Sequence, residues 1–184
     1  MKEIEARFLE IDVQAMEIKL KELGARDLGD DFFEEIIFYD KDLEWQKDGR
    51  IHVRLRKTKN GTFMSYKDAR DETLSGTKEI EVKVDDFNSA RSLLEAAGLV
   101  AYRIQEKKRR SFVLDGVKID IDQWPAIPPY VEIEGRSEEA VREMAKRLGF
   151  SWDRAIFGNA GATIGKYYNI PIKHLRHFTF SKVE

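Results

Sequence analysis

The stretch RIQEKKRRSFVLDGVKIDID, residues 103–122, decides the fold because it contains a β-hairpin with one ionic face. The dipeptide Asp115-Gly116 is typical of a two-residue hairpin turn, so the runs on its two sides should pair antiparallel. After the turn, Asp120 and Asp122 alternate with isoleucines. A strand points successive side chains to opposite faces, so the carboxylates share one face and the apolar side chains the other.

The same alternation extends outward along the chain and predicts a sheet of eight strands. These strands are expected at about 2–9, 33–40, 50–57, 62–69, 77–84, 102–114, 117–123 and 130–135. Amphipathic helices that begin at Asp or Ser and end at Gly are expected at 12–23, 85–97 and 137–148, with a shorter helix near 155–168. Eight strands can close without leaving edges. We therefore predict an α+β fold, a closed eight-stranded antiparallel β-barrel (tunnel) with the helices packed outside.

Composition limits the classes of protein that the chain can belong to. With 184 residues, 42% of them hydrophobic, it suits one domain, which we place at 1–170 with a C-terminal tail, 171–184, packed on it. The formal net charge of −2 favours neither a nucleic-acid polymer nor a membrane as partner. No cysteine is present, which excludes disulfides, thiolate zinc sites and cysteine nucleophiles. The start lacks the apolar run of a signal peptide, so a cytoplasmic protein is expected.

The ionic face of the predicted sheet is sorted by sign. Carboxylates two residues apart occur in four strands, as Glu3/Glu5, Glu79/Glu81, Asp120/Asp122 and Glu132/Glu134. Basic residues of the same phase are Arg7, Arg54, Arg56 and Lys67. The strand expected at 102–114 offers Lys107 and Arg109 in one phase and Lys108 and Arg110 in the other. Unit charges about 5 Å apart repel by roughly 3 kcal/mol at an effective dielectric near 20, and a merely soluble face would intersperse the two signs. This sorting favours a face that binds a polyanion together with its cations. The alternative is a charged face exposed to water.

The residue types indicate which cation and which anion this face suits. Carboxylate ligands without Cys, and with only three His in the chain, select Mg²⁺ or Mn²⁺ over Zn²⁺. Arginine forks bind phosphate oxygens in pairs, and lysine binds them as a point charge. The expected ligand is a phosphate-rich small molecule with its divalent metal.

At these residues the sequence resembles the CYTH superfamily, named for class IV adenylyl cyclase and thiamine triphosphatase and also called triphosphate tunnel metalloenzymes. The resemblance covers about residues 1–170. Its motifs appear here as Glu3-Ile4-Glu5-Ala6-Arg7, Phe38-Tyr39-Asp40, Arg54-Leu55-Arg56, Lys67, Lys107-Lys108-Arg109-Arg110, and Asp122 followed by Glu132-Ile133-Glu134. Arg7 stands where the family usually has Lys, which keeps the charge and loses a side chain whose pKa burial could lower.

The resemblance implies a role for each group of residues. Metal ligands would be Glu3, Glu5, Asp122, Glu132 and Glu134, with Glu79, Glu81 and Asp120 as weaker candidates. Triphosphate would bind Arg7, Arg54, Arg56, Lys67, Lys107 and Arg109, with Lys67 and Arg56 as the catalytic cations. The expected activity is a metal-dependent phosphohydrolase acting on tripolyphosphate, a nucleoside triphosphate or thiamine triphosphate. An adenylyl cyclase making cyclic AMP and pyrophosphate, and a non-catalytic polyphosphate-binding module, are the alternatives. The expected partner is a triphosphate-containing small molecule, and a homodimer is allowed.

Overall fold

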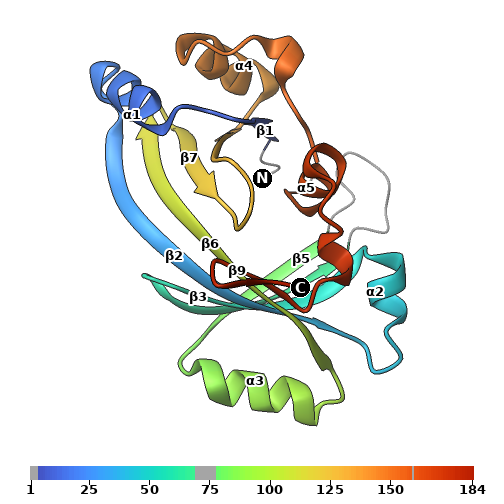
Figure 1. The fold of residues 1–184 in the computed structure, drawn as a ribbon. Helices are drawn as coiled ribbons and strands as arrows, with labels where there is room; N and C mark the ends of the chain where they lie inside the picture. Colours follow the sequence, from blue (N-terminus) through green and yellow to red (C-terminus); the bar gives the residue numbers. More distant parts are fainter. Residues whose placement is uncertain (1–3, 69–77, 159) are drawn as a thin grey trace. The chain divides into compact units, whose positions relative to one another are not determined.

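The structure is a computed structural model that describes residues 4–68, 78–158 and 160–184. Its strands are β1 (Ile4–Phe8), β2 (Arg26–Tyr39), β3 (Ile51–Thr58), β4 (Gly61–Asp68), β5 (Lys78–Val84), β6 (Val100–Leu114), β7 (Val117–Gln123), β8 (Tyr130–Gly135), β9 (His177–Thr179) and β10 (Lys182–Val183) (Figure 1). Its α-helices are α1 (Val13–Glu22), α2 (Glu44–Asp48), α3 (Phe87–Ala96), α4 (Glu138–Arg147) and α5 (Ala160–Tyr168). The predicted α+β class is confirmed.

Strands β1 to β8 form one antiparallel sheet in the order β1-β8-β7-β6-β2-β3-β4-β5. The predicted hairpin is present, with Leu114 opposite Val117 and with both turn residues, Asp115 and Gly116, at positive φ. Among the described residues the sheet is not closed by hydrogen bonds. The antiparallel sheet is therefore confirmed, whereas a closed barrel stays a prediction.

Some elements differ from the expectation. Strand β2 begins at Arg26, well before the predicted start near residue 33. The extra part of this strand contains Gly29, Asp30 and Asp31, residues typical of turns, so strand pairing overrides the local preference. The short helix α2 and the strands β9 and β10 were not predicted, because each is too short to show a period.

The chain divides into two compact units. The first unit comprises Met1–Asp31 and Lys108–Ile170, and the second comprises Phe32–Lys107 and Pro171–Glu184. Strands β2 and β6 therefore contribute residues to both units. The prediction of one domain over 1–170 stays a prediction.

Each unit has its own apolar core, formed by helices on the apolar face of strands. In the first unit, α1 and α4 bury Leu20, Val141 and Met144 against strand residues such as Ile119 and Ile133. In the second unit, α3 buries Ala90 and Leu94 against Ile36, Val53 and Leu55. The helices cover the apolar face of these strands. The ionic residues alternate with the apolar ones, so they lie on the opposite face.

The C-terminal tail is part of the second unit. Strand β9 pairs parallel with β6, with His177 opposite Ile104, and β10 pairs with β9. Phe178 is fully buried. These contacts give the tail a fixed position on the strands of that unit.

The helix ends follow the predicted chemistry. Asp12 and Ser137 accept hydrogen bonds from backbone N–H groups in the first turns of α1 and α4. For α3 the cap is Asp86, one residue later than the predicted start at 85. Gly24, which follows α1, has a φ of +76°, a conformation in which a side chain would be strained.

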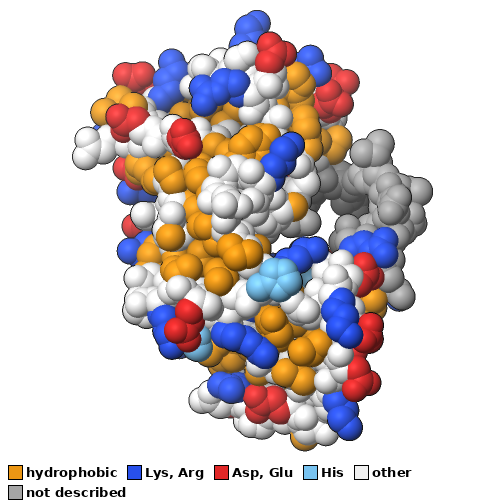
Figure 2. All heavy atoms as spheres, turned by 45° about the vertical axis from the view of Figure 1, so that its right-hand side comes forward, with side chains coloured by type: hydrophobic (Ala, Val, Ile, Leu, Met, Phe, Trp, Pro, Cys, Tyr) orange, Lys and Arg blue, Asp and Glu red, His pale blue; other side chains and the backbone are white. Residues whose placement is uncertain are grey.

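The face drawn in Figure 2 carries acidic, basic and hydrophobic side chains interspersed with one another. This mixing agrees with the nearly balanced formal charge of the chain. None of the helices in the described ranges has the length and apolar composition needed to cross a membrane.

Candidate functional site

The first unit gathers ionic residues from β1, β6, β7 and β8 into one group that we call the acidic cluster. Its members are Glu5, Arg7, Arg109, Lys118, Asp120, Asp122, Glu132 and Glu134. Strand register brings them together, since Arg7 lies opposite Glu132, and Arg109 lies opposite Asp122. Seven of the site residues predicted from the alternation in the sequence therefore lie together in the first unit.

Arg109 holds the centre of the acidic cluster. Its Nε and Nη2 donate to the two oxygens of Asp122, each at 2.6 Å, and Nη2 also lies 3.0 Å from Glu132 Oε1. Nη1 pairs with Asp120. Burial alone would lower the pKa of Arg109, but Asp122, Asp120 and Glu132 outweigh it and hold that pKa well above its ordinary value. This guanidinium is positively charged at every accessible pH.

Arg7 forms the second ionic centre of the unit. Its Nη2 lies 2.8 Å from Glu5 Oε1 and 2.7 Å from Glu132 Oε2, and its Nη1 donates to the carbonyl oxygen of Gly158. Burial would lower the pKa of Arg7, but Glu132 and Glu5 raise it above its ordinary value. Arg7 Nε is buried and has no hydrogen-bond partner in the described part of the chain. One donor of this arginine thus remains available for a ligand.

The acidic cluster keeps a surplus of negative charge. Five carboxylates face three cations, since Lys118 Nζ, 2.8 Å from Asp120 Oδ2, is the third. The surplus of two charges and the all-oxygen donor set fit a hard divalent cation. Within residues 4–68, 78–158 and 160–184, however, no three carboxylates are arranged around a metal-sized position, because arginines lie among them.

The second unit gathers a complementary group that we call the basic cluster. Its charged members are Glu35, Arg54, Arg56, Lys67, Glu79, Glu81, Arg103 and Lys107. They come from β2, β3, β4, β5 and β6. Among its described members, five cations face three carboxylates, so these residues together have a surplus of two positive charges.

Glu35 is the buried counter-ion of the basic cluster. Its Oε1 lies 2.5 Å from Arg56 Nε, and its Oε2 accepts a hydrogen bond from Gln105 Nε2. Burial alone would raise the pKa of Glu35, but Arg56, Arg54 and Lys107 outweigh it and lower that pKa to about 2. Glu35 was not predicted, because the apolar run that surrounds it obscures its phase.

Arg54 is held much more loosely than Arg109. Among the described residues, its carboxylate contacts are 3.5 Å to Glu79, 3.8 Å to Glu81 and 4.0 Å to Glu35. Its side chain is only 14% exposed, and burial lowers its pKa from the ordinary value. Its Nε has no hydrogen-bond partner in the described ranges. A buried arginine in this state is prepared to bind an anion.

The other basic residues are fixed by neighbours on adjacent strands. Lys67 Nζ lies 3.1 Å from Glu79 Oε2, and Lys107 Nζ lies 4.9 Å from the centre of the Phe33 ring. His52 lies opposite Lys67 in the strand register. Burial, together with Arg54, Lys67 and Arg103, lowers the pKa of His52 to about 4, so the ring is neutral at pH 7. The basic cluster therefore keeps its surplus of two at neutral pH.

The predicted residues thus fall into two groups. Glu5, Arg7, Arg109, Asp120, Asp122, Glu132 and Glu134 lie in the acidic cluster, whereas Arg54, Arg56, Lys67, Glu79, Glu81 and Lys107 lie in the basic cluster. Glu3 lies outside the described residues. The predicted role of each residue stays a prediction.

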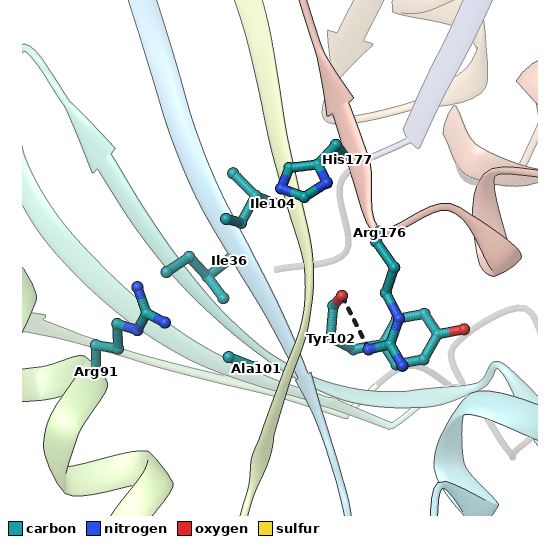
Figure 3. A pocket seen from close by; sticks show the side chains of 7 residues that line it. All are labelled: Ile36, Arg91, Ala101, Tyr102, Ile104, Arg176 and His177. Atoms are coloured by element: carbon teal, nitrogen blue, oxygen red, sulfur yellow. Dashed lines mark hydrogen bonds between the residues drawn. The ribbon is translucent and has the colours of Figure 1, made fainter. Parts of the chain in front are cut away.

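A separate pocket of about 290 Å³ lies in the second unit (Figure 3). It is lined by Ile36, Arg91, Ala101, Tyr102, Ile104, Arg176 and His177, none of which was predicted. Its arginines have partners: the Arg176 guanidinium lies over the Tyr102 ring at 3.8 Å, and Arg91 Nε pairs with Glu95 at 3.0 Å. We assign no role to this pocket.

Comparison with known proteins identifies the family. The family model of the CYTH domain matches residues 1–154. The chain belongs to the CYTH family. No curated protein matches it. The resemblance read from the ionic strands is therefore confirmed.

Solved structures show the same fold at low sequence identity. A protein from Pyrococcus horikoshii OT3 superposes with a TM-score of 0.68 at 21% identity, over 84% of this chain and 94% of that chain. A candidate adenylate cyclase from Vibrio parahaemolyticus gives 0.72 at 13% identity, over 89% and 97%. A candidate adenylyl cyclase from Hippeastrum, described as having a dominant triphosphatase activity, gives 0.64 at 15% identity, over 91% and 96%. At these identities, the comparisons show that the chains share a fold.

Proposed function

We propose that this CYTH protein is a metal-dependent phosphohydrolase that binds and cleaves a triphosphate. The observation that carries the proposal is the separation of charge between two ionic clusters, one with two surplus negative charges and the other with two surplus positive charges. A triphosphate needs cations along its oxygens, and the metal that accompanies it needs carboxylates.

The basic residues have the role of binding and orienting the phosphates. Arg54 and Arg56 would supply guanidinium forks, whereas Lys67 and Lys107 would supply point charges. Arg7 and Arg109, which belong to the first unit, are the other two proposed phosphate-binding residues. Because Arg54 Nε lacks a partner among the described residues, a phosphate oxygen would satisfy it without displacing an existing hydrogen bond. Cations fixed in advance also stabilise negative charge that moves during attack on phosphorus.

The carboxylates have the role of holding Mg²⁺ or Mn²⁺. Glu5, Asp122, Glu132 and Glu134 are the proposed ligands, and Glu3 joins them in the motif. When bound, the metal would neutralise phosphate oxygens and help to orient the chain of phosphates. Three of these four carboxylates pair with an arginine, so a metal would compete with Arg7 and Arg109 for them. A closed tunnel around the bound ligand is part of the proposal.

The experiment is a product assay on tripolyphosphate, ATP and thiamine triphosphate with Mg²⁺ or Mn²⁺. Orthophosphate release supports the hydrolase. Cyclic AMP with pyrophosphate would favour the cyclase, the function suggested by the names of the Vibrio and Hippeastrum proteins. Ligand-induced stabilisation without any product would favour the non-catalytic polyphosphate-binding module. EDTA-treated protein without added metal is the control.

A further inference from the structure

A row of three residues crosses β3, β4 and β5 on the ionic face of the second unit. Arg54 lies opposite Ser65 in the β3–β4 register, and Ser65 lies opposite Glu81 in the β4–β5 register. Ser65 is 1% exposed, and it shares its face with Lys67, two residues away. Ser65 is therefore a buried hydroxyl inside the basic cluster, at a position where no ligand role was predicted.

Two polar atoms of this row lack partners. Neither Ser65 Oγ nor Arg54 Nε has a hydrogen bond within residues 4–68, 78–158 and 160–184. Leaving a buried donor unsatisfied costs free energy, and native proteins contain few such groups. An alanine would fill the place of Ser65 without that cost. Two unsatisfied donors on directly paired residues thus point to an acceptor from outside the described residues.

The charge around the row indicates the nature of that acceptor. Among residues 4–68, 78–158 and 160–184, the carboxylate contacts of Arg54 are those with Glu79, Glu81 and Glu35, at 3.5–4.0 Å. A water molecule could bridge the two donors, but it would leave the positive surplus of the basic cluster uncompensated. An oxyanion both accepts the hydrogen bonds and neutralises charge.

We infer that Ser65 Oγ and Arg54 Nε form a subsite for a phosphate oxygen of the triphosphate, with Ser65 as a further ligand-binding residue. The inference rests on the proposed function, because it names a donor in the same basic cluster. The hydroxyl donates its proton in a hydrogen bond, while the guanidinium supplies the charge. Ser65 thus stabilises the complex with the ligand, whereas its unsatisfied hydroxyl destabilises the free protein.

The inference predicts that Ser65→Ala raises the stability of the free protein and lowers its affinity for tripolyphosphate. Without ligand, the variant should be more stable, with an unfolding constant roughly fivefold smaller, since the unsatisfied hydroxyl is gone. Its affinity for tripolyphosphate should be about tenfold weaker, since a hydrogen bond to a charged group is lost. Urea denaturation and calorimetric titration of tripolyphosphate, both in EDTA, measure the two effects separately from metal binding.

Two further variants control the experiment. Ser65→Cys keeps the size of the side chain and replaces a strong donor with a weak one, so it should bind tripolyphosphate as weakly as Ser65→Ala. Ser111 is a matched serine of the first unit whose Oγ donates to Asp120 at 2.6 Å. Ser111→Ala should therefore destabilise the free protein, opposite in sign to Ser65→Ala.

The measurements of binding and stability can each overturn the assignment of Ser65 as a ligand-binding residue. Equal tripolyphosphate affinity of wild type and Ser65→Ala would overturn it, as would a free Ser65→Ala protein that is less stable than wild type. No binding by wild type in EDTA would also overturn it. The product assay with metal tests the proposed function independently, so the subsite can fail while the triphosphatase stands.

Discussion

The acidic and basic clusters are built from the same kind of strand and differ in how completely their charges are paired. In the acidic cluster, Arg109 donates to both oxygens of Asp122 at 2.6 Å, and Asp122 is fully buried. In the basic cluster, the contacts of Arg54 with described carboxylates are longer, at 3.5–4.0 Å. The first arrangement pairs the guanidinium closely, whereas the second leaves Arg54 Nε without a hydrogen-bond partner in the described ranges.

The two clusters also differ in sign, with two surplus negative charges in one and two surplus positive charges in the other. Each surplus costs free energy in the absence of a ligand, because like charges repel in a partly buried site. A protein selected only for stability would balance each cluster separately. The comparison therefore teaches that arginines on the same kind of ionic strand face differ in how closely carboxylates pair with them.

The largest expected effect tests the structural role of Arg109. Arg109→Met removes the partner of buried carboxylates, so we expect a loss of about 3–5 kcal/mol in the free energy of unfolding. The matched control is Arg110→Met, since Arg110 pairs with Glu17 and Asp27 in partly exposed contacts. That change should cost about 1 kcal/mol or less. Urea denaturation measures both, and similar losses would contradict the distinction.

The next effect concerns Glu35, whose removal takes the buried carboxylate out of the basic cluster. Its pKa is about 2 in the folded protein against an ordinary 4.5, so its ionised form stabilises the fold above pH 4.5. This stabilisation, about 3 kcal/mol, should disappear as the pH falls toward 2. Unfolding of Glu35→Gln and wild type should therefore differ most near pH 6 and converge near pH 2.

The neighbouring residue provides the control for that pH dependence. Glu34 is 51% exposed and lies 3.4 Å from Lys57. Glu34→Gln should change stability by less than about 1 kcal/mol across the same pH range. A Glu34 variant that reproduces the Glu35 profile would show that burial of Glu35 has no special effect.

A third prediction addresses the surplus of negative charge in the acidic cluster. Glu134→Gln should reduce metal-dependent hydrolysis at least about 100-fold, since it removes a proposed metal ligand. The free protein should be as stable as wild type or slightly more stable, because repulsion among the carboxylates falls. Steady-state assays with varied Mg²⁺ and thermal unfolding in EDTA check the two parts. Near-normal turnover would remove Glu134 from the metal site.

The smallest effect concerns His52, which is neutral in the folded basic cluster. Its pKa is about 4 when folded against an ordinary 6.5, so protonation favours the unfolded chain. Stability from neutral His52 is complete above pH 6.5 and is lost as the pH falls toward 4. Since the ring keeps some exposure to water, we expect about 1–2 kcal/mol. His52→Gln should flatten the stability curve between pH 6.5 and 4, and an unchanged slope would contradict this.

Much of the two clusters was predictable from local pattern. A period of two places Glu132 and Glu134 on one face, and Arg54 and Arg56 on one face, whatever the neighbouring strands are. The Asp115-Gly116 turn also set the pairing of β6 with β7 and hence the meeting of Arg109 with Asp122. Family motifs agreed with both features, so the fold class and the family followed from the sequence.

The contact of Glu35 with Arg56 could not be predicted from local pattern. Glu35 lies among apolar residues, and its contact with Arg56 depends on the register of β2 against β3, two strands separated by helix α2. No tight turn links these strands, so their register cannot be read from the intervening residues. The pairing of β3, β4 and β5 likewise had to be known before Ser65 could be seen as a buried hydroxyl beside Arg54.

The sequence by itself determined which side chains share a face, because alternation along a strand is a property of the backbone alone. It also determined the signs of charge on each strand, and through them the family. Only the tertiary structure decided which charges meet, because ion pairs depend on distances between strands far apart in the chain. For that reason Arg109, which is closely paired, and Arg54, whose Nε has no partner in the part of the chain that the structure describes, look alike in the sequence and differ in the fold.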